Sequence, residues 1–262
     1  MMDVWSDEEM ERILGHNDGG SPPRRRAAVA GASLRRLAAE CSDLAGLLIG
    51  PESSESSSSS PEDEKKKVPT VRYGRTGLQM PIVSLGCMRF QQTWNGSAVS
   101  SPDLVDAECQ DNLVRILRHA VRCGVYHIET AKAYGCSELQ LGLALKTLFD
   151  DGTCSREDLI VQTKGGISSS TTRLEYRMQI LEQIERLGLE YVDLFSVHGV
   201  NTDDHCDWLF EGGENGRGNL IEALRELRDE GKVRWIGFST HAPAHVIKRV
   251  IETDAFDYVN RE

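Results

Sequence analysis

Residues 159–198 read LIVQTKGGISSSTTRLEYRMQILEQIERLGLEYVDLFSVH and hold one complete strand–helix–strand unit. Leu159–Gln162 and Tyr191–Val197 are short, largely apolar runs typical of buried strands. Between them, Thr172–Leu187 carries apolar residues at helical spacing, and Gly188 follows as a helix terminator. Two strands joined through a helix in this way run parallel, so the stretch predicts a parallel β/α protein.

The same alternation continues along the chain in both directions. Strands are predicted at 82–85, 125–128, 159–162, 191–197, 233–238 and 256–259, and helices at 111–123, 137–149, 172–187, 219–230 and 243–252. An open doubly wound sheet and a (β/α)₈ barrel both fit this pattern. The connection after the first strand, Gly86–Phe90, lacks the G-x-G-x-x-G of nucleotide-binding open sheets. The expected fold class is therefore α/β: an incomplete (β/α)₈-type barrel of about six units.

Composition excludes several classes of protein. The net charge of −11, without a basic stripe, makes nucleic acid and anionic membranes poor partners. No run of about 18 apolar residues predicts a membrane span. The seven cysteines are scattered and form no C-x-x-C, so neither a disulfide framework nor a metal site is expected. This cysteine usage suits a reducing compartment, and we expect a cytoplasmic location.

The first 68 residues differ in composition from the rest. Residues 53–60 are serine except for Glu55, and runs of acidic residues and lysines follow. Such a segment buries too little apolar surface to offset its ordering entropy, so 1–68 is predicted to be a disordered tail and 69–262 a barrel domain. The basic, alanine-rich residues 24–48 leave a transit peptide for plastids or another organelle as the alternative location. The acidic residues Asp7–Glu11 argue against that alternative.

Limited proteolysis is expected to cut first within residues 53–67 and to leave the remainder of the chain resistant. The reason is that an exposed, polar segment offers its backbone to a protease, whereas the predicted barrel does not. Mass spectrometry of the early fragments checks this, and protection of the serine run would overturn the domain boundary.

Ionisable and polar residues lie at the ends of successive predicted strands, one β/α unit apart. Glu129 to Lys164 is 35 positions and Lys164 to His198 is 34. Tyr134 lies shortly after Glu129, and Ser239, Thr240 and His241 end the fifth strand. In a parallel barrel the carboxyl ends of the strands share one rim, which is where active sites lie. A single residue of this kind is usually structural, but the shared spacing favours a functional cluster.

Four blocks resemble the aldo-keto reductase superfamily, in its order. They are GVYHIETAKAYGCSE (124–138), LIVQTKGG (159–166), RLGLEYVDLFSVH (186–198) and LRELRDEGKVRWIGFS (224–239). The sequence is most similar to a branch whose members often carry a C-terminal iron–sulfur extension, which is absent here. The resemblance runs from about Val71 to the end.

The resemblance implies an enzyme that reduces an aldehyde or ketone to an alcohol with hydride from NAD(P)H, the expected cofactor being NADPH. It implies a tetrad in which Tyr134 donates the proton, Lys164 activates Tyr134, Glu129 orients Lys164 and His198 fixes the carbonyl oxygen. A lysine ammonium beside a phenol favours the phenolate and so makes the phenol a better acid. Glu129 replaces the usual Asp. Cofactor contacts are implied for Gly86, Met88, Ser239, Thr240 and Asn260, where Thr240 replaces the usual Asn.

Two alternatives to an active reductase stay open at this point. Only six of the eight strands of a (β/α)₈ barrel are predicted before Glu262, so the chain is expected to be truncated at its C-terminus. An inactive fragment is therefore one interpretation. A second is a non-catalytic, regulatory barrel of the same superfamily. The partners expected are a small carbonyl substrate and, through open sheet edges, a second copy of the chain.

Overall fold

A computed structural model describes residues 68–212 and 217–261 of the chain. The tail predicted over residues 1–68 lies outside the described residues, apart from Val68. The part that the structure describes therefore begins with the segment predicted to be the barrel domain.

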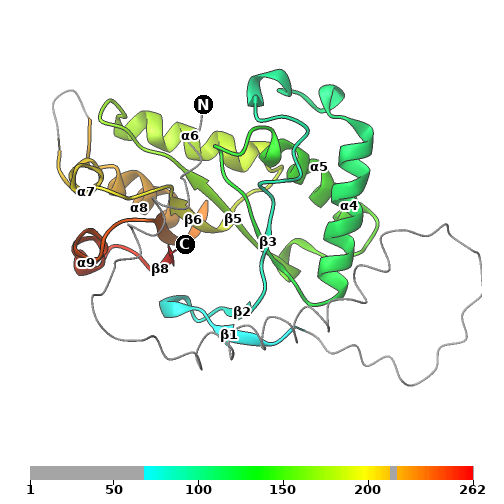
Figure 1. The fold of residues 1–262 in the computed structure, drawn as a ribbon, viewed down its shortest axis with the longest axis horizontal. Helices are drawn as coiled ribbons and strands as arrows, with labels where there is room; N and C mark the ends of the chain where they lie inside the picture. Colours follow the sequence, from blue (N-terminus) through cyan, green and yellow to red (C-terminus); the bar gives the residue numbers. More distant parts are fainter. Residues whose placement is uncertain (1–67, 213–216, 262) are drawn as a thin grey trace, which may run out of the picture. The chain divides into compact units, whose positions relative to one another are not determined.

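A six-stranded parallel sheet forms the centre of this part, in the chain order β3-β4-β5-β6-β7-β8 (Figure 1). Each strand pairs in parallel with the next along the chain. The bounds are β3 Leu85–Gly86, β4 His127–Glu129, β5 Ile160–Gly165, β6 Val192–Val197, β7 Val233–Thr240 and β8 Tyr258–Arg261. The sheet curls like part of a barrel wall, so the predicted incomplete (β/α)₈-type fold is confirmed.

Helices connect the strands and cover the outer face of the curled sheet (Figure 1). Their bounds are α4 Ala107–Arg122, α5 Ser137–Asp150, α6 Arg173–Arg186, α7 Asp203–Phe210, α8 Ile221–Asp229 and α9 Ala244–Glu252. Short 3₁₀ turns lie at Gly74–Thr76, Gly96–Ala98, Pro102–Leu104 and Arg156–Asp158. The main apolar core lies between helices and sheet, and every side chain of β5 and β6 is buried.

A hairpin precedes the sheet and lies at the amino ends of its strands. Its strands are β1 Thr70–Arg72 and β2 Gln79–Pro81, paired antiparallel. The Tyr126 hydroxyl, just before β4, donates to the carbonyl of Gln79 at 2.6 Å. Met80 packs with Ile160 and Leu194 in a second, smaller apolar cluster. Strand ends opposite to this hairpin are therefore the ones that carry the predicted site.

Local predictions differ from the structure at several boundaries, and two of these differences lie in the first strand and in the segment after β6. Ile82 and Val83 were expected in the first strand, but they are exposed and only Leu85–Gly86 pair with β4. Residues 201–217 were expected to be a loop, yet they contain α7, which begins where the Thr202 hydroxyl caps the backbone N–H of His205. Eight residues with two buried side chains give too little apolar periodicity to predict.

Candidate active site

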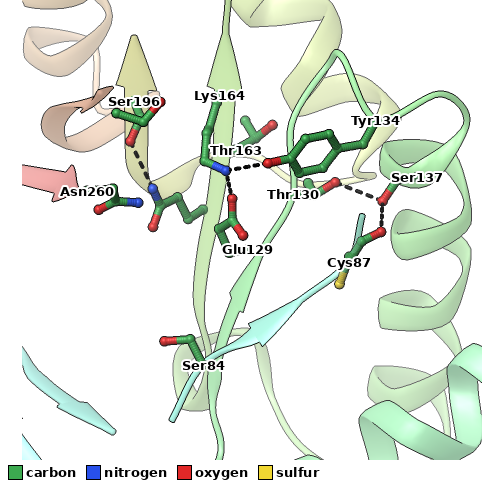
Figure 2. Close-up of polar contacts among 12 residues, drawn as sticks. Ser84, Cys87, Glu129, Thr130, Tyr134, Ser137, Thr163, Lys164, Ser196 and Asn260 are labelled. Carbon is green, nitrogen blue, oxygen red and sulfur yellow. Dashed lines mark hydrogen bonds and ion pairs between the residues drawn. The ribbon is translucent and has the colours of Figure 1, made fainter. Parts of the chain in front are cut away.

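The four residues of the predicted tetrad come together at the carboxyl ends of β4, β5 and β6. Glu129 ends β4, Tyr134 lies in the following loop, Lys164 is on β5 and His198 directly follows β6. Strand side chains alternate between faces, so Glu129, the register partner of Gln162, shares a face of the sheet with Lys164, and Figure 2 shows the two side chains pointing toward each other. The sequence spacing thus predicted neighbours correctly, while the roles of these residues stay predictions.

Lys164 is the centre of the cluster. Its side chain is 2% exposed and its ammonium forms an ion pair with Glu129. The same ammonium donates to the Tyr134 hydroxyl at 2.7 Å (Figure 2). The ring of His198 stands edge-on to the ring of Tyr134, with 5.8 Å between centroids and 89° between planes. A carboxylate, an ammonium, a phenol and an imidazole therefore follow one another in contact.

The loop that carries Tyr134 is held at both of its ends. The hydroxyls of Thr130 and Ser137 are hydrogen-bonded to each other at 2.9 Å, and Ser137 donates to the carbonyl of Cys87 at 2.7 Å (Figure 2). Gly135 has φ +60°, and a Cβ there would lie 2.4 Å from the carbonyl oxygen of Thr93. Only glycine fits this position, next to the proposed proton donor.

The predicted cofactor contacts fall at the ends of β3, β7 and β8. Ser239 and Asn260 are register partners on adjacent strands, so both project to the inner face with the tetrad. Ser239 accepts a hydrogen bond from the N–H of Gly199, which leaves its O–H to donate. A hydroxyl and a carboxamide side by side fit the nicotinamide carboxamide, which needs both donors and acceptors.

The remaining predicted cofactor contacts, Gly86, Met88 and Thr240, differ from one another in their surroundings. Gly86 lies beside Glu129, where a Cβ would be 3.6 Å from Glu129 Oε2, and Met88 follows it in the loop. Thr240 is buried, and its hydroxyl donates to the carbonyl of Val200 and accepts from the N–H of Ala242. Since strand neighbours alternate, Thr240 faces away from Ser239, and its contacts are those of a residue that holds the following loop.

A row of polar side chains crosses the inner face beneath the tetrad. Ser84, His127, Gln162, Ser196 and Tyr258 are joined in that order by hydrogen bonds of 2.7, 3.0, 2.8 and 3.0 Å. Because the Gln162 amide nitrogen donates to Ser196, its oxygen accepts from His127 Nε2, and His127 Nδ1 accepts from Ser84. We call this row the polar ladder.

The ladder was not predicted as a unit, although part of its signal is in the sequence. Gln162 lies two residues before Lys164 and Ser196 two before His198, so both share the inner face. Tyr258 also packs against Tyr73 of the N-terminal segment at 5.4 Å between centroids, and Tyr73 donates to Asn260 at 2.8 Å. Burial raises the pKa of Tyr73 to about 12, so this phenol remains a donor. Nothing in the sequence pattern signals that contact.

Tyr258 has room only because its neighbour in the sheet is a glycine. Gly237 is its register partner on β7, and a Cβ at Gly237 would lie 2.4 Å from ring atoms of Tyr258. The side chain of Tyr258 thus occupies the space above the β7 backbone.

Acid is expected to destabilise the protein through His127. Burial lowers the pKa of His127 from 6.5 to about 4, so the folded chain keeps it neutral while the unfolded chain takes up a proton below about pH 6.5. This contribution to the free energy of unfolding is complete above about pH 6.5 and is lost as the pH falls toward 4, by about 3 kcal/mol in total.

Urea unfolding midpoints at pH 7, 5.5 and 4.5 measure this loss. His127→Gln should show a flatter pH dependence than the unmodified chain, whereas the exposed His245→Gln should not. Equal slopes in all three proteins would refute the assignment.

Comparison with known proteins places the geometry in context. The Aldo/keto reductase family model matches residues 83–259. The chain is 30% identical over 193 residues to an L-galactose dehydrogenase of Arabidopsis thaliana, covering 71% of this chain and 52% of that protein. It is 27% identical over 202 residues to an NADH-specific methylglyoxal reductase of Escherichia coli, covering 69% and 54%. The chain spans about half the length of these curated relatives.

Solved structures agree in fold. A Bombyx mori aldo-keto reductase in complex with NADP superposes with a TM-score of 0.54 at 22% sequence identity, covering 75% of this chain and 58% of that one. Among the described residues, no helix is long and apolar enough to cross a membrane. Within the same ranges, no group of three or more His, Cys, Asp or Glu side chains could hold a metal ion.

Proposed function

The chain belongs to the aldo/keto reductase family, and from this premise we propose that it is an NAD(P)H-dependent oxidoreductase that reduces an aldehyde or ketone to an alcohol. The observation that carries the proposal is the 2.7 Å hydrogen bond between Lys164 and Tyr134, backed by Glu129 and flanked by His198. NADPH is the proposed cofactor, since a structural relative is a complex with NADP.

When bound, NAD(P)H would supply hydride to the carbonyl carbon of the substrate. Negative charge then builds on the carbonyl oxygen, and Tyr134 donates its proton there. The ammonium of Lys164 stabilises the phenolate that remains, and the carboxylate of Glu129 keeps that ammonium charged and directed at Tyr134. His198, beside the Tyr134 ring, donates a hydrogen bond that fixes the carbonyl oxygen. Ser239 and Asn260 would hold the nicotinamide carboxamide of the bound cofactor.

The extra methylene of Glu129 is compatible with this role. A Glu in place of the usual Asp brings its carboxylate farther from the strand, and the neighbouring strand presents Gly86 at the paired position. The carboxylate reaches Lys164 without meeting a side chain of β3. We therefore propose that Glu129 replaces the Asp of the family without loss of function.

Stopped-flow oxidation of NADPH and of NADH against a panel of aldehydes and ketones tests the proposal. Turnover with one cofactor supports it and identifies the cofactor. Fluorescence titration in parallel decides the alternatives: binding without turnover would favour the regulatory barrel, and neither binding nor turnover would favour an inactive chain. A reducing compartment such as the cytoplasm is proposed with it, since the six cysteines in the described residues are all free.

Self-association of the 262-residue chain is a further expected result. In the described residues, β3 and β8 each pair with one neighbour in the parallel sheet, so backbone donors and acceptors are available along those edges. Size-exclusion chromatography with light scattering should give a mass that rises with concentration. A concentration-independent monomer would contradict this expectation.

A further inference from the structure

The carbonyl oxygen of Lys164 joins two segments of the proposed active site. It accepts a hydrogen bond at 3.0 Å from the backbone N–H of Lys132, in the loop that carries Tyr134. It accepts a second one, also at 3.0 Å, from the side-chain amide of Gln183 on α6. This single carbonyl oxygen therefore restrains both the backbone position of Lys164 in β5 and the loop that carries Tyr134.

Gln183 extends this connection into the helices behind the sheet. It is fully buried, and its amide nitrogen also lies 2.8 Å from Glu138 Oε1 and 3.2 Å from Thr163 Oγ1. The Thr163 hydroxyl donates to the same Glu138 oxygen at 2.6 Å. The other Glu138 oxygen accepts two bonds from Arg186, at 2.9 and 2.7 Å. Helices α5 and α6 therefore hold the end of β5 on the face opposite to the Lys164 ammonium.

The space for Gln183 depends on a glycine that directly follows Lys164. A Cβ at Gly165 would lie 2.7 Å from Gln179 Nε2, 2.9 Å from Phe195 Cζ and 3.0 Å from Gln183 Oε1. A larger residue would push Gln183 away from the Lys164 carbonyl. The strand end is thus shaped to let this one side chain reach the backbone.

We propose that Gln183 is a positioning residue for the Lys164–Tyr134 pair. It fixes the backbone of Lys164 and, through the shared carbonyl, the loop of Tyr134, without touching substrate or cofactor. The catalytic part of this inference rests on the proposed reductase function. Its structural part, restraint of the Tyr134 loop, does not.

Gln183→Met tests the inference because it removes the amide and keeps side-chain length and packing. Each group that loses the amide keeps another hydrogen bond: the Lys164 carbonyl still accepts from the Lys132 N–H, and the Thr163 hydroxyl still donates to Glu138. The variant is therefore expected to fold. Gln110→Met is the control, since the part-buried Gln110 amide donates to the carbonyl of Gln140 at the same 3.0 Å, a bond that includes no residue of the tetrad.

Hydrogen exchange measured by mass spectrometry is the first readout and needs no activity. In Gln183→Met, exchange of the amides in residues 131–135 should quicken about tenfold, with peptides from β7 and α9 unchanged. Gln110→Met should leave residues 131–135 as in the unmodified chain. Unchanged exchange in Gln183→Met would overturn the inference. An equal increase across all peptides would also overturn it, because it would assign Gln183 a general structural role.

Steady-state kinetics is the second readout. In Gln183→Met, kcat should fall about tenfold while KM for the carbonyl changes less than twofold, since the pair acts on the proton and not on substrate binding. A kcat equal to that of Gln110→Met would overturn the positioning role. A parent chain without turnover that still shows the local exchange effect would refute the proposed function and leave the loop restraint by Gln183 standing.

Discussion

Tyr134→Phe is expected to lower kcat by about 10² or more in any preparation that reduces carbonyls, because it removes the proton that the developing alkoxide needs. The substitution deletes one oxygen and leaves the ion pair of Lys164 and Glu129 in place. Cofactor binding should therefore be little changed, and NADPH fluorescence titration should give a Kd similar to that of the unmodified chain. Stopped-flow NADPH oxidation at saturating substrate measures the loss.

The control for Tyr134→Phe is Tyr126→Phe. The Tyr126 hydroxyl donates to Gln79 at the amino end of the strands, away from the tetrad. This variant loses one phenol and one hydrogen bond but should keep kcat. Turnover of Tyr134→Phe close to that of Tyr126→Phe would remove Tyr134 from the mechanism.

Lys164→Met should abolish reduction and also weaken the fold. Methionine fills the space of the lysine stem but leaves Glu129, whose side chain is only 19% exposed, without its counter-ion. Loss of one partner of a buried pair costs about 3 kcal/mol, at the low end of the usual range because Glu129 keeps some solvent. Urea unfolding measures the stability and NADPH oxidation the activity.

A double variant separates these two effects. Lys164→Met combined with Glu129→Gln removes the unpaired charge, so part of the lost stability should return while activity stays absent. Because methionine keeps the packing of the lysine stem, the loss of stability is expected to come from the broken ion pair between Lys164 and Glu129. Measurable reduction by either variant would contradict the role of the ammonium in activating Tyr134.

The alternation of short apolar runs with helical segments predicted the order and direction of the six strands, because a parallel β/α protein repeats one simple pattern. Boundaries were less predictable where a single residue decides them. Asn219, expected to begin a helix, has φ +49° and lies before α8. Asp106 caps α4 by accepting from Cys109 N–H, so that helix begins four residues earlier than the apolar spacing indicated. The hairpin of β1 and β2 is too short for any periodicity.

Strand spacing also predicted that Glu129, Lys164 and His198 would be neighbours. It could not predict the Lys164–Tyr134 contact, because Tyr134 lies on a loop whose path depends on Ser137, Cys87 and the packing around Gly135. The partners of Gln183 and the order of the polar ladder depend on how far the sheet curls. That curvature is a property of packing between elements and leaves no local pattern in the sequence.

The contact between Gly237 and Tyr258 has a consequence for protein engineering. In a combinatorial library that randomises both positions, survivors should covary: any residue larger than glycine at position 237 should be recovered only with a smaller residue than tyrosine at 258. Such an exchange would move side-chain volume from β8 to β7. It would also remove the hydrogen bond between Ser196 and Tyr258, which is the last one of the polar ladder. Deep sequencing of folded clones would reveal this epistasis: clones that combine a residue larger than glycine at position 237 with tyrosine at position 258 should be nearly absent.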